Sequence, residues 1–295
     1  MVRQIVHVAA CPVGCSANRA VTPVRRPPLT VGAMKRVLFI LLSAIFLTSC
    51  GISNKTVFEG PPNSEAEAEY RQAVKTLEDG AYEESVRHFH DIKLKYPYAT
   101  RWATLCDLRI ADAYRYSGDY AQAAVAYQSF VRTYPAHADI PYASYQAANS
   151  YYELMPSDIF ILPDPWQRDS KSTVQAQTAF QVFLARYPDD ENAPKAREQL
   201  AEVRRRLAER ELYIAEYNFK NEAYRGAVAR LDGLVRTYPD FEKAPKAHIL
   251  LAHSFLKLHD PVSAKAALLK LIEQYPEAPE VADAKSWIER NKEVP

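Results

Sequence analysis

Glycine is scarce in this chain, which has only 8 glycines among its 295 residues. Loops that bind nucleotide phosphates need several glycines close together, because a residue without a Cβ lets the backbone approach the ligand. The sequence contains neither the glycine pattern of a P-loop nor that of a dinucleotide-binding fold. These absences argue against a nucleotide-binding enzyme.

Cysteine and histidine are also few, with four and seven residues in the whole chain. No His-Glu-x-x-His motif and no paired-cysteine zinc motif occurs, and the acidic residues are spread along predicted helix faces. We therefore predict no catalytic residue, no metal site and no cofactor, although a catalytic dyad of distant residues stays open. Cys106 lies in an apolar helical pattern and is predicted to be a small core residue.

The chain has no overall excess of charge, since 37 basic and 36 acidic residues give a net charge of +1 at pH 7. Six of the basic residues and none of the acidic ones lie in residues 1–49. The remaining 31 basic and 36 acidic residues give the rest of the chain a net charge of −5. A mildly acidic body has no electrostatic attraction to nucleic acid, so we predict no nucleic-acid partner.

The apolar run from Val37 to Leu47 has 11 residues, too few to span a bilayer as a stable helix. It follows Met34-Lys35-Arg36 and precedes Leu47-Thr48-Ser49-Cys50, an order typical of a bacterial lipoprotein signal. We predict a signal peptide at 34–49, lipidation of Cys50 and a lipidated tether at 50–63. An ordinary signal peptide followed by an incidental cysteine is the alternative.

Resemblance to bacterial lipoproteins implies a diacylglycerol on Cys50, and two or more acyl chains hold a protein firmly on a bilayer. Gly51-Ile52 follows the cysteine without an aspartate. By analogy with the sorting rule of enteric bacteria, this indicates the periplasmic face of the outer membrane. Residues 1–33 fit neither signal nor fold, and we expect a spurious extension ahead of Met34; a redox or metal pair of Cys11 and Cys15 is the alternative.

A repeat organises the rest of the chain. The dipeptide Tyr-Pro occurs five times, beginning at Tyr96, Tyr134, Tyr187, Tyr238 and Tyr275. A small residue stands eleven positions before each tyrosine, and large residues stand seven and four positions before it. The small residues are Ser85, Ala123, Ala176, Ala227 and Ala264; the large ones are Phe89, Tyr127, Phe180, Leu231 and Leu268, then Ile92, Phe130, Phe183, Leu234 and Leu271. These steps place them on one face of a helix that ends at Tyr-Pro, because proline disfavours helical geometry in the preceding residue.

These features resemble the tetratricopeptide repeat, in which such a helix is the second of a pair. We predict an all-α fold: an α-α superhelix of about five helix pairs plus a C-terminal capping helix. The N-terminal repeats would occupy 64–171 and the C-terminal repeats with the cap 172–295, with Gly80 and Ser117-Gly118 at turns within pairs. The expected first helices are about 64–79, 99–116, 139–155, 192–219 and 242–259, and the capping helix about 278–291.

One predicted connection, residues 156–172 within the third pair, is long for a compact solenoid and rich in proline and aspartate. Long loops are often functional, so its apolar residues are candidates for binding a partner. Folding back onto the solenoid is an equal alternative for Ile159, Phe160, Ile161 and Trp166. The long helix that follows carries Arg204-Arg205-Arg206 among glutamates, which indicates a solvated face with helical salt bridges.

Stacked helix pairs curve, and their first helices line a concave side that suits protein binding. In the second and third pairs these helices are rich in aromatic and amide side chains. Some must be core, and the rest would offer flat apolar surface with polar tips to an extended peptide. The candidates for this substrate groove are Tyr114, Tyr116, Tyr145, Asn149 and Tyr152, with Tyr142 and Tyr151 beside them.

With the lipidation signal, the five repeats and the insert in the third, residues of about 34–290 resemble the BamD (YfiO/ComL-type) family of lipoproteins of the outer-membrane β-barrel assembly machinery. Specific matches are Pro61-Pro62-Asn63, Asp79-Gly80, Tyr96-Pro97-Tyr98, Arg168-Asp169 and Ala215-Glu216-Tyr217. The resemblance implies a periplasmic scaffold without enzymatic activity. Its N-terminal repeats would engage unfolded outer-membrane proteins, its C-terminal repeats would contact a POTRA domain of the barrel insertase, and other assembly lipoproteins would bind it.

The family has a functionally sensitive arginine in the second helix of the fourth repeat. Arg230, in Arg230-Leu231-Asp232-Gly233, matches that position. The resemblance therefore implies a partner-binding surface in the segment 221–236, with Arg230, Asp232 and Asn221 as candidates. An exposed helix cation of little energetic value is the alternative for Arg230.

Two other functions stay open from the sequence. A tetratricopeptide lipoprotein adaptor in cell-wall synthesis or division would share the fold without binding barrel proteins. An enzyme with an unrecognised site, such as a cell-wall hydrolase, is the third possibility. A pull-down from solubilised outer membrane separates the assembly scaffold from the cell-wall adaptor. Release of muropeptides by the pure protein would identify the enzyme.

Overall fold

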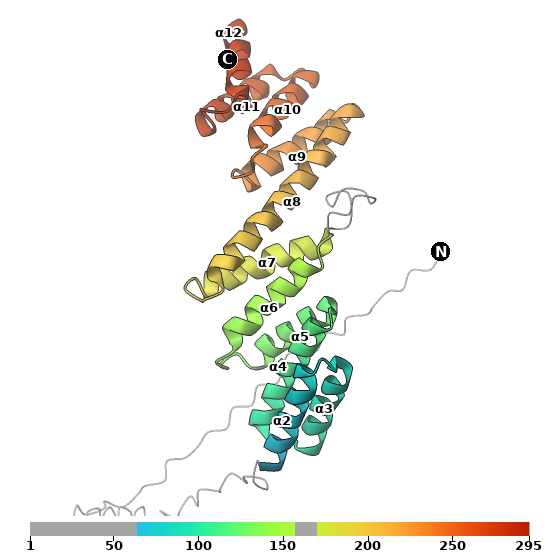
Figure 1. Ribbon diagram of the computed structural model, residues 1–295. Helices are drawn as coiled ribbons and strands as arrows, with labels where there is room; N and C mark the ends of the chain where they lie inside the picture. The colour runs from blue at the N-terminus through green and yellow to red at the C-terminus, as the bar shows by residue number, and fades with distance from the viewer. Residues whose placement is uncertain (1–63, 157–169, 295) are drawn as a thin grey trace, which may run out of the picture. The chain divides into compact units, whose positions relative to one another are not determined.

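The computed structural model describes residues 64–156 and 170–294, and within them it contains α-helices and no β-strand. The helices follow one another as pairs (Figure 1). Four pairs have short turns: α2 (Ser64–Glu78) with α3 (Tyr82–Lys95), α4 (Thr100–Tyr116) with α5 (Tyr120–Thr133), α8 (Ala193–Lys220) with α9 (Tyr224–Thr237), and α10 (Ala244–Lys257) with α11 (Pro261–Gln274). The third pair, α6 (Ile140–Glu153) and α7 (Lys171–Arg186), flanks the insert, and α12 (Glu280–Arg290) follows the last pair. The predicted all-α repeat fold is confirmed.

Several predicted features lie outside the described residues. These are the extension at 1–33, the signal peptide at 34–49, Cys50 with its tether at 50–63, and the centre of the insert at 157–169. Among the helices that the structure does describe, none combines the length and apolar character needed to cross a bilayer.

The small and large positions that define the repeat form the core of each pair. The five small residues are all 0% exposed, which lets the neighbouring helix approach closely at that level. The ten large residues are also buried, with at most 4% of their surface exposed. Each large apolar side chain contributes roughly 1.5–3 kcal/mol on burial. The predicted helical face is therefore the face that holds each pair together.

The second helix of each pair ends at its Tyr-Pro with the same geometry. The tyrosine N–H donates to the carbonyl oxygen four residues earlier, while its ψ of 58° to 61° leaves the helical region. Its own carbonyl accepts a hydrogen bond from the N–H three residues later, as from Ala99 to Tyr96 at 3.0 Å. The result is a turn over the proline, after which the next first helix begins.

In the four pairs with a short connection, the turn between the two helices places one residue in the left-handed region of backbone conformation. Gly80 (φ +83°) and Gly118 (φ +80°) do this in the first two pairs, as their position in the sequence predicts. Glu222 (φ 59°) and His259 (φ 60°) occupy the same place in the last two pairs, two residues before the second helix. A left-handed backbone conformation is less favourable by roughly 1–2 kcal/mol for a residue with a Cβ than for glycine.

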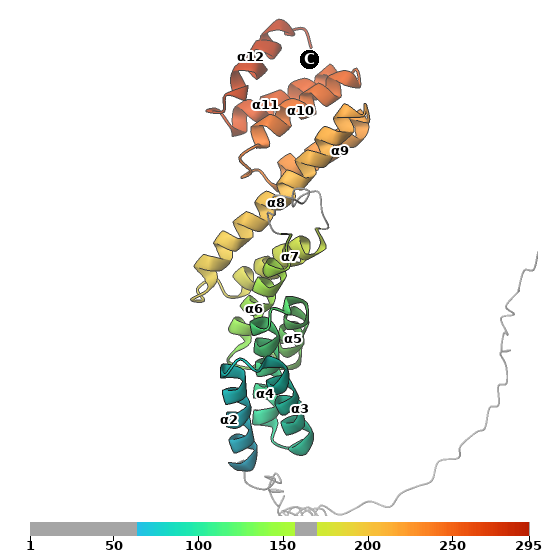
Figure 2. The same ribbon diagram turned by 45° about the vertical axis from the view of Figure 1, so that its right-hand side comes forward.

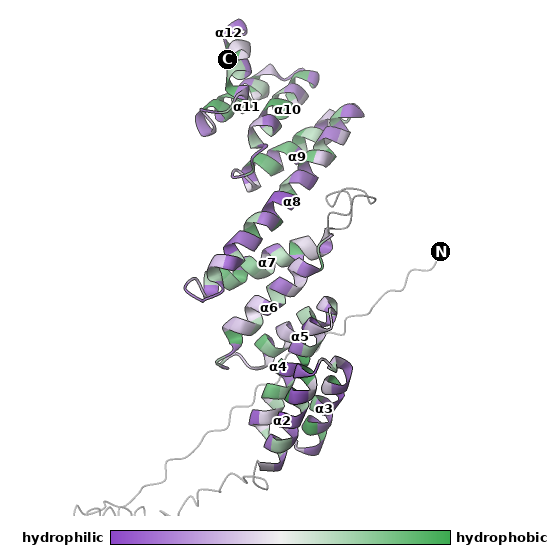
Figure 3. Ribbon diagram, viewed as in Figure 1, coloured by the Kyte–Doolittle hydropathy of each residue, from purple (hydrophilic) through white to green (hydrophobic). Residues whose placement is uncertain are grey.

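Successive helices pack against one another, so the core consists of a series of clusters. The helices are amphipathic, with hydrophobic and hydrophilic residues alternating around them (Figure 3). The 28-residue α8 contributes its first half to the cluster with α6 and α7, and its second half to the cluster with α9, α10 and α11. At the other end of that cluster, Val281 and Ala284 of α12 are buried against α10 and α11 (Figure 2). The helix α12 therefore caps the last pair, as predicted.

Candidate protein-binding surfaces

Asp112 of α4 is the centre of a buried polar network in the N-terminal repeats, with 1% of its side chain exposed. Its Oδ2 accepts a hydrogen bond from Arg109 Nη1 at 2.5 Å. Its Oδ1 accepts from the hydroxyls of Tyr127 at 2.5 Å and Tyr142 at 2.8 Å. Arg109 Nε extends the network to the Tyr70 hydroxyl at 3.3 Å. The donors compensate the cost of burying a carboxylate and join α2, α4, α5 and α6.

Tyr127, Tyr142 and Arg109 keep one protonation state near neutral pH. Burial, reinforced by the charge of Asp112, raises the pKa of Tyr127, and it raises that of Tyr142 to about 12. Burial alone would lower the pKa of the Arg109 guanidinium, but its contacts with Tyr70 and Asp112 outweigh that effect and raise the pKa. Both phenols therefore stay protonated and can donate to Asp112, and the arginine stays charged.

Tyr116, at the end of α4, is the only predicted groove residue that lies openly on the surface, with 52% of its area exposed. Its ring stacks on Tyr82 of α3, with centroids 6.2 Å apart and planes 21° apart. The Arg115 guanidinium lies 4.1 Å from its centroid, and Arg115 Nε donates to the Tyr127 hydroxyl at 3.3 Å. We call Tyr82, Arg115 and Tyr116 the aromatic–cation cluster. It presents flat apolar faces and a fixed positive charge.

Tyr145 does not line an open groove, and its predicted role is corrected. It is 3% exposed, and its ring packs on Phe180 and Phe183 with centroid distances of 6.4 Å and 5.6 Å. Its hydroxyl donates to Gln199 Oε1 of α8 at 3.1 Å. Because the first helices of neighbouring pairs meet here, Tyr145 is a core residue that joins α6 to α8.

The other predicted groove residues are half-buried. Asn149 Oδ1 accepts from Gln199 Nε2 at 2.7 Å, so Asn149 belongs to the same α6–α8 contact. Tyr152 packs edge-on against Phe180 at 6.3 Å between centroids, and Tyr114 packs against both the cluster of α2, α3 and α4 and the cluster of α4, α5 and α6. The five predicted groove residues thus lie in different environments along α4 and α6.

Arg230 lies in the middle of α9, beside a shallow depression between α8 and α9. Its side chain is 48% exposed, and its Nη1 donates to Glu211 Oε2 of α8 at 3.1 Å. A Cβ added at Gly233 would meet no atom within 4 Å, so the depression is open at this position. Its lining residues are Glu211, Ala229, Arg230, Gly233, Thr237 and Tyr238. We call this surface the Arg230 depression.

Asp232 and Asn221 do not line the Arg230 depression. Asp232 pairs with Arg236 one turn further along α9, at 3.4 Å. Its separation of two residues from Arg230 turns it to another side of the helix. Asn221 follows the last residue of α8, where its Nδ2 donates to the Tyr217 carbonyl at 2.8 Å. Of the three predicted partner-binding residues, the structure places only Arg230 at the depression.

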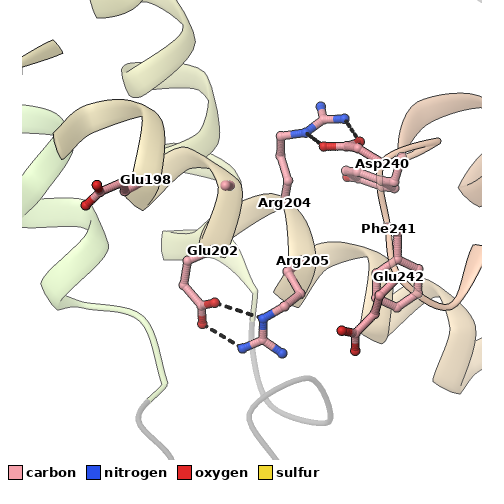
Figure 4. Close-up of a pocket in the computed structure, with 9 residues that line it drawn as sticks. Glu198, Glu202, Arg204, Arg205, Asp240, Phe241 and Glu242 are labelled. Atoms are coloured by element: carbon pink, nitrogen blue, oxygen red, sulfur yellow. Dashed lines mark hydrogen bonds and ion pairs between the residues drawn. The ribbon is translucent and has the colours of Figure 1, made fainter. Parts of the chain in front are cut away.

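A charged cleft lies where α8 meets the connection between α9 and α10 (Figure 4). Arg204 Nη2 donates to Asp240 Oδ1 at 2.6 Å, which fastens that connection to α8. Arg205 and Arg206 both pair with Glu202, at 2.8 Å and 2.6 Å. The predicted salt bridges along the helix are confirmed, and the pair with Asp240 adds a bridge between elements. The arginines that line this cleft are therefore paired, and the ion pair of Arg204 holds the connection between α9 and α10 against α8.

Reactive groups are sparse in the part of the chain that the structure describes. Cys106 is buried as predicted, and burial, followed by the charge of Asp107, raises the pKa of its thiol to about 12. A reactive thiolate is therefore disfavoured at this position. Residues 64–156 and 170–294 contain no group of three or more His, Cys, Asp or Glu side chains placed to hold a metal ion.

Comparison with known proteins gives a family match and a set of relatives. The family model described as "YfiO: Outer membrane lipoprotein" matches residues 62–259. "Outer membrane protein assembly factor BamD" of Pasteurella multocida is 26% identical over 240 residues, covering 80% of this chain and 90% of the relative. The protein of the same name from Vibrio cholerae is 27% identical over 236 residues, covering 78% and 95%. Among solved structures, the TPR domain of P58(IPK) aligns with 90% of this chain and 61% of its own, at 13% identity and a TM-score of 0.39.

Proposed function

Because this chain belongs to the YfiO family of outer membrane lipoproteins, and its relatives are outer membrane protein assembly factors, we propose that it is a scaffold of the β-barrel assembly machinery. In this proposal a lipid on Cys50 holds it at the periplasmic face of the outer membrane. One surface binds the POTRA-bearing barrel insertase, a second receives unfolded outer-membrane proteins, and other assembly lipoproteins bind the same scaffold. Such a protein acts by holding its partners, without catalysis.

The observation that carries the insertase interface is the geometry at Arg230. Its half-exposed guanidinium is held by Glu211 and borders a depression that stays open beside Gly233. A guanidinium fixed in this way can bind a second carboxylate through paired hydrogen bonds. A POTRA domain with a carboxylate on its surface would therefore find a preoriented partner at the Arg230 depression.

The test is a pull-down from detergent-solubilised outer membrane with the tagged full-length protein. We expect the unaltered protein to retain a POTRA-bearing barrel protein and Arg230→Leu to retain it with an affinity lower by roughly tenfold or more, because each charge-assisted hydrogen bond contributes about 1.5–3 kcal/mol. Gly233→Leu should also weaken retention, because it fills the depression and leaves the arginine in place. Arg225→Leu, an exposed arginine of α9 outside the depression, is the matched control. Full retention by Arg230→Leu and Gly233→Leu would overturn this interface.

The proposed surface for unfolded substrates is the aromatic–cation cluster. Aromatic side chains of a barrel precursor can stack on Tyr116 and Tyr82, and Arg115 supplies a charge for an acidic group. Tyr116→Ala should weaken binding of a labelled peptide taken from a barrel strand, as measured by fluorescence anisotropy. Tyr217→Ala, which removes an exposed tyrosine of α8, is the control. Equal affinity of the two variants would remove the cluster from the substrate-binding surface.

Two further measurements separate this function from its alternatives. Cys50→Ala should move the protein from the membrane fraction to the soluble periplasm if the anchor is the proposed lipid. Depletion of the protein should lower the amount of folded barrel proteins in the outer membrane. Normal barrel levels, together with recovery of cell-wall synthases in the pull-down, would favour the cell-wall adaptor.

A further inference from the structure

The first Tyr-Pro turn, between α3 and α4, exposes apolar side chains at one end of the first helix pair. Leu94 is 80% exposed and Tyr98 is 84% exposed, and Pro97 beside them is exposed as well. Leu94 and Tyr98 are the two most exposed of the large hydrophobic residues that the structure describes. We call Leu94, Pro97 and Tyr98 the α3–α4 tip.

The other four Tyr-Pro turns show that the repeat itself does not require apolar side chains at these places. Two residues before the tyrosine, where the first turn has Leu94, the later turns have alanine or a charged residue. Two residues after the tyrosine, where the first turn has Tyr98, they have alanine or an acidic residue. The equivalents are Arg132, Ala185, Arg236 and Glu273, and then Ala136, Asp189, Asp240 and Glu277. The apolar character of the tip is therefore confined to the first pair.

The α3–α4 tip lies at the end of the pair where the chain from Cys50 arrives. The helix α2 begins at Ser64 and runs antiparallel to α3, so its first turns lie beside the end of α3 (Figure 1). Glu69 of α2 accepts a hydrogen bond from the Tyr96 hydroxyl at 2.9 Å. Residues 51–63 are thirteen in number, so Ser64 lies no more than about 50 Å from Cys50. A bilayer that holds Cys50 is therefore within reach of the tip.

The charged side chains around the tip form no cationic surface. In the part of the chain that the structure describes, Glu65, Asp91 and Arg101 have no opposite charge within ion-pair distance, and two of the three are acidic. The remaining charges are paired: Lys93 with Asp107, Lys95 with Glu69, and Arg71 with Glu67. Attraction between the tip and another surface therefore has to come from burial of its apolar side chains.

The interface of a bilayer accepts both side chains of the tip. Tyrosine places its ring among the headgroups and keeps its hydroxyl in water, and leucine buries its methyl groups at the boundary of the acyl chains. Arg101, whose guanidinium lies 5.2 Å from the centroid of the Trp102 ring, can pair with one lipid phosphate. A protein interface buries roughly 800 Å² on each partner, more than three side chains on a tight turn supply, whereas a bilayer accepts side chains singly.

From these features we propose that the α3–α4 tip rests on the bilayer that holds Cys50, with Leu94 and Tyr98 inserted among the lipid headgroups. This inference rests on the lipid anchor proposed above, because two side chains alone hold a protein weakly and a nearby anchor raises their effective concentration at the membrane. The contact orients the first pair on the membrane. The aromatic–cation cluster lies at the opposite ends of α3 and α4, so the tip holds it within one helix length, about 25 Å, of the headgroups.

Photocrosslinking in reconstituted membranes tests this contact. Tyr98 is replaced by p-benzoylphenylalanine, which keeps an aromatic side chain at the tip. The full-length lipoprotein is reconstituted into mixed phosphatidylethanolamine and phosphatidylglycerol vesicles that contain a radioactive phospholipid. We expect light to join the phospholipid to position 98. The same replacement of Tyr217, an exposed tyrosine of α8, is the control and should give little adduct. Equal amounts of lipid adduct at the two positions would overturn the proposal.

Substitution of the neighbouring leucine identifies the force that holds the tip. Leu94→Asp should lower the adduct at position 98 by roughly tenfold or more, the factor that burial of one leucine side chain provides. Leu269→Asp, at a leucine of α11 that is 49% exposed, is the matched control and should leave the adduct unchanged. The adduct should also persist at about 0.5 M salt, because an apolar contact is not screened. Loss of the adduct in salt, or an equal loss in Leu269→Asp, would contradict an apolar contact.

A second form of the protein separates this inference from the lipid anchor. Flotation of the vesicles with the unaltered protein and with Cys50→Ala reports on the anchor alone. A Cys50→Ala protein with a histidine tag in place of the residues before Gly51 is then held on a nickel-chelating lipid. It should give the same adduct at position 98, and its absence would overturn the tip contact whatever holds Cys50. Crosslinking of position 98 in cells to a protein and not to lipid would assign the tip to a protein partner instead.

Discussion

At the scale of single residues, Asp112 has a large structural role that little in the sequence indicates. Its carboxylate accepts hydrogen bonds from Arg109, Tyr127 and Tyr142, so its loss leaves one partly buried cation and two phenols without their acceptor. We expect Asp112→Ala to lower the free energy of unfolding by about 3–5 kcal/mol. Urea denaturation followed by circular dichroism measures this loss. Asp91→Ala, on an exposed position of α3, should change it by less than about 0.5 kcal/mol, and comparable effects in the two variants would contradict the role of the network.

His248 makes the stability of the C-terminal repeats depend on pH. It is 1% exposed, and burial lowers the pKa of its imidazole below 6.5. The unfolded chain therefore binds the proton more readily than the folded one. Above pH 6.5 His248 is neutral in both states and does not lower the free energy of unfolding. As the pH drops through 6.5 toward the lowered pKa of the folded state, the free energy of unfolding falls.

We expect His248→Leu to remove this part of the pH dependence. The difference in urea midpoint between pH 7 and pH 5 should become smaller than in the unaltered protein. His253→Leu, at an exposed position of the same helix, should leave the difference as it was. An unchanged pH dependence in His248→Leu would show that other groups dominate the loss.

Only part of this residue-level picture could be predicted from the sequence. Burial of Cys106 and of the repeated small and large positions follows from helical periodicity, which is local. Burial of Tyr145 could not be predicted, because its partner Gln199 lies 54 residues further along the chain. The position of Asp112 among Ile110, Ala111 and Ala113 is the one available signal for the network, since a lone acid in an apolar stretch needs donors. Proximity in space decides such pairs, and spacing in the sequence does not.

At the scale of elements, helix ends were predictable wherever a residue itself imposes them. Tyr-Pro ends the second helices at the expected places, and first helices expected at 192–219 and 242–259 lie at 193–220 and 244–257. The turns at Glu222 and His259 carry no glycine, so no local signal reveals their left-handed backbone. They are imposed by the helix pair, because the four pairs with short connections share the same turn.

These two turns store strain that glycine would relieve. We expect Glu222→Gly and His259→Gly to raise the free energy of unfolding, each by roughly 0.5–1 kcal/mol once the greater freedom of glycine in the unfolded chain is subtracted. Glu222→Ala is the control, because it removes the same side chain but keeps the Cβ. Urea denaturation of the three variants provides the comparison. A gain in Glu222→Ala as large as in Glu222→Gly would assign the effect to the side chain instead of the backbone.

At the scale of the whole molecule, α8 links the repeats that carry the proposed docking surfaces. Ala196, Val203 and Leu207 pack with α6 and α7, in the cluster that continues toward the N-terminal repeats. Ala208 and Leu212 belong to the cluster of α9, which carries the Arg230 depression. Tyr238 also packs against both clusters. The continuous backbone of α8 is therefore the main rigid connection between the two groups of repeats.

Breaking α8 between these clusters tests that connection. Arg210 is half-buried and lies between Ala208 and Leu212, and Arg210→Pro removes one helical hydrogen bond and clashes with the preceding turn, at a cost of roughly 3 kcal/mol or more. Because repeat proteins unfold as coupled neighbouring units, we expect the variant to unfold in two separated steps, resolved by hydrogen exchange along a urea titration. Arg210→Ala keeps the helix and should keep the protection of both groups of repeats coupled. If both groups still lose protection at one urea concentration in Arg210→Pro, then the contacts of Tyr238 and the pair between Arg204 and Asp240 suffice to couple them.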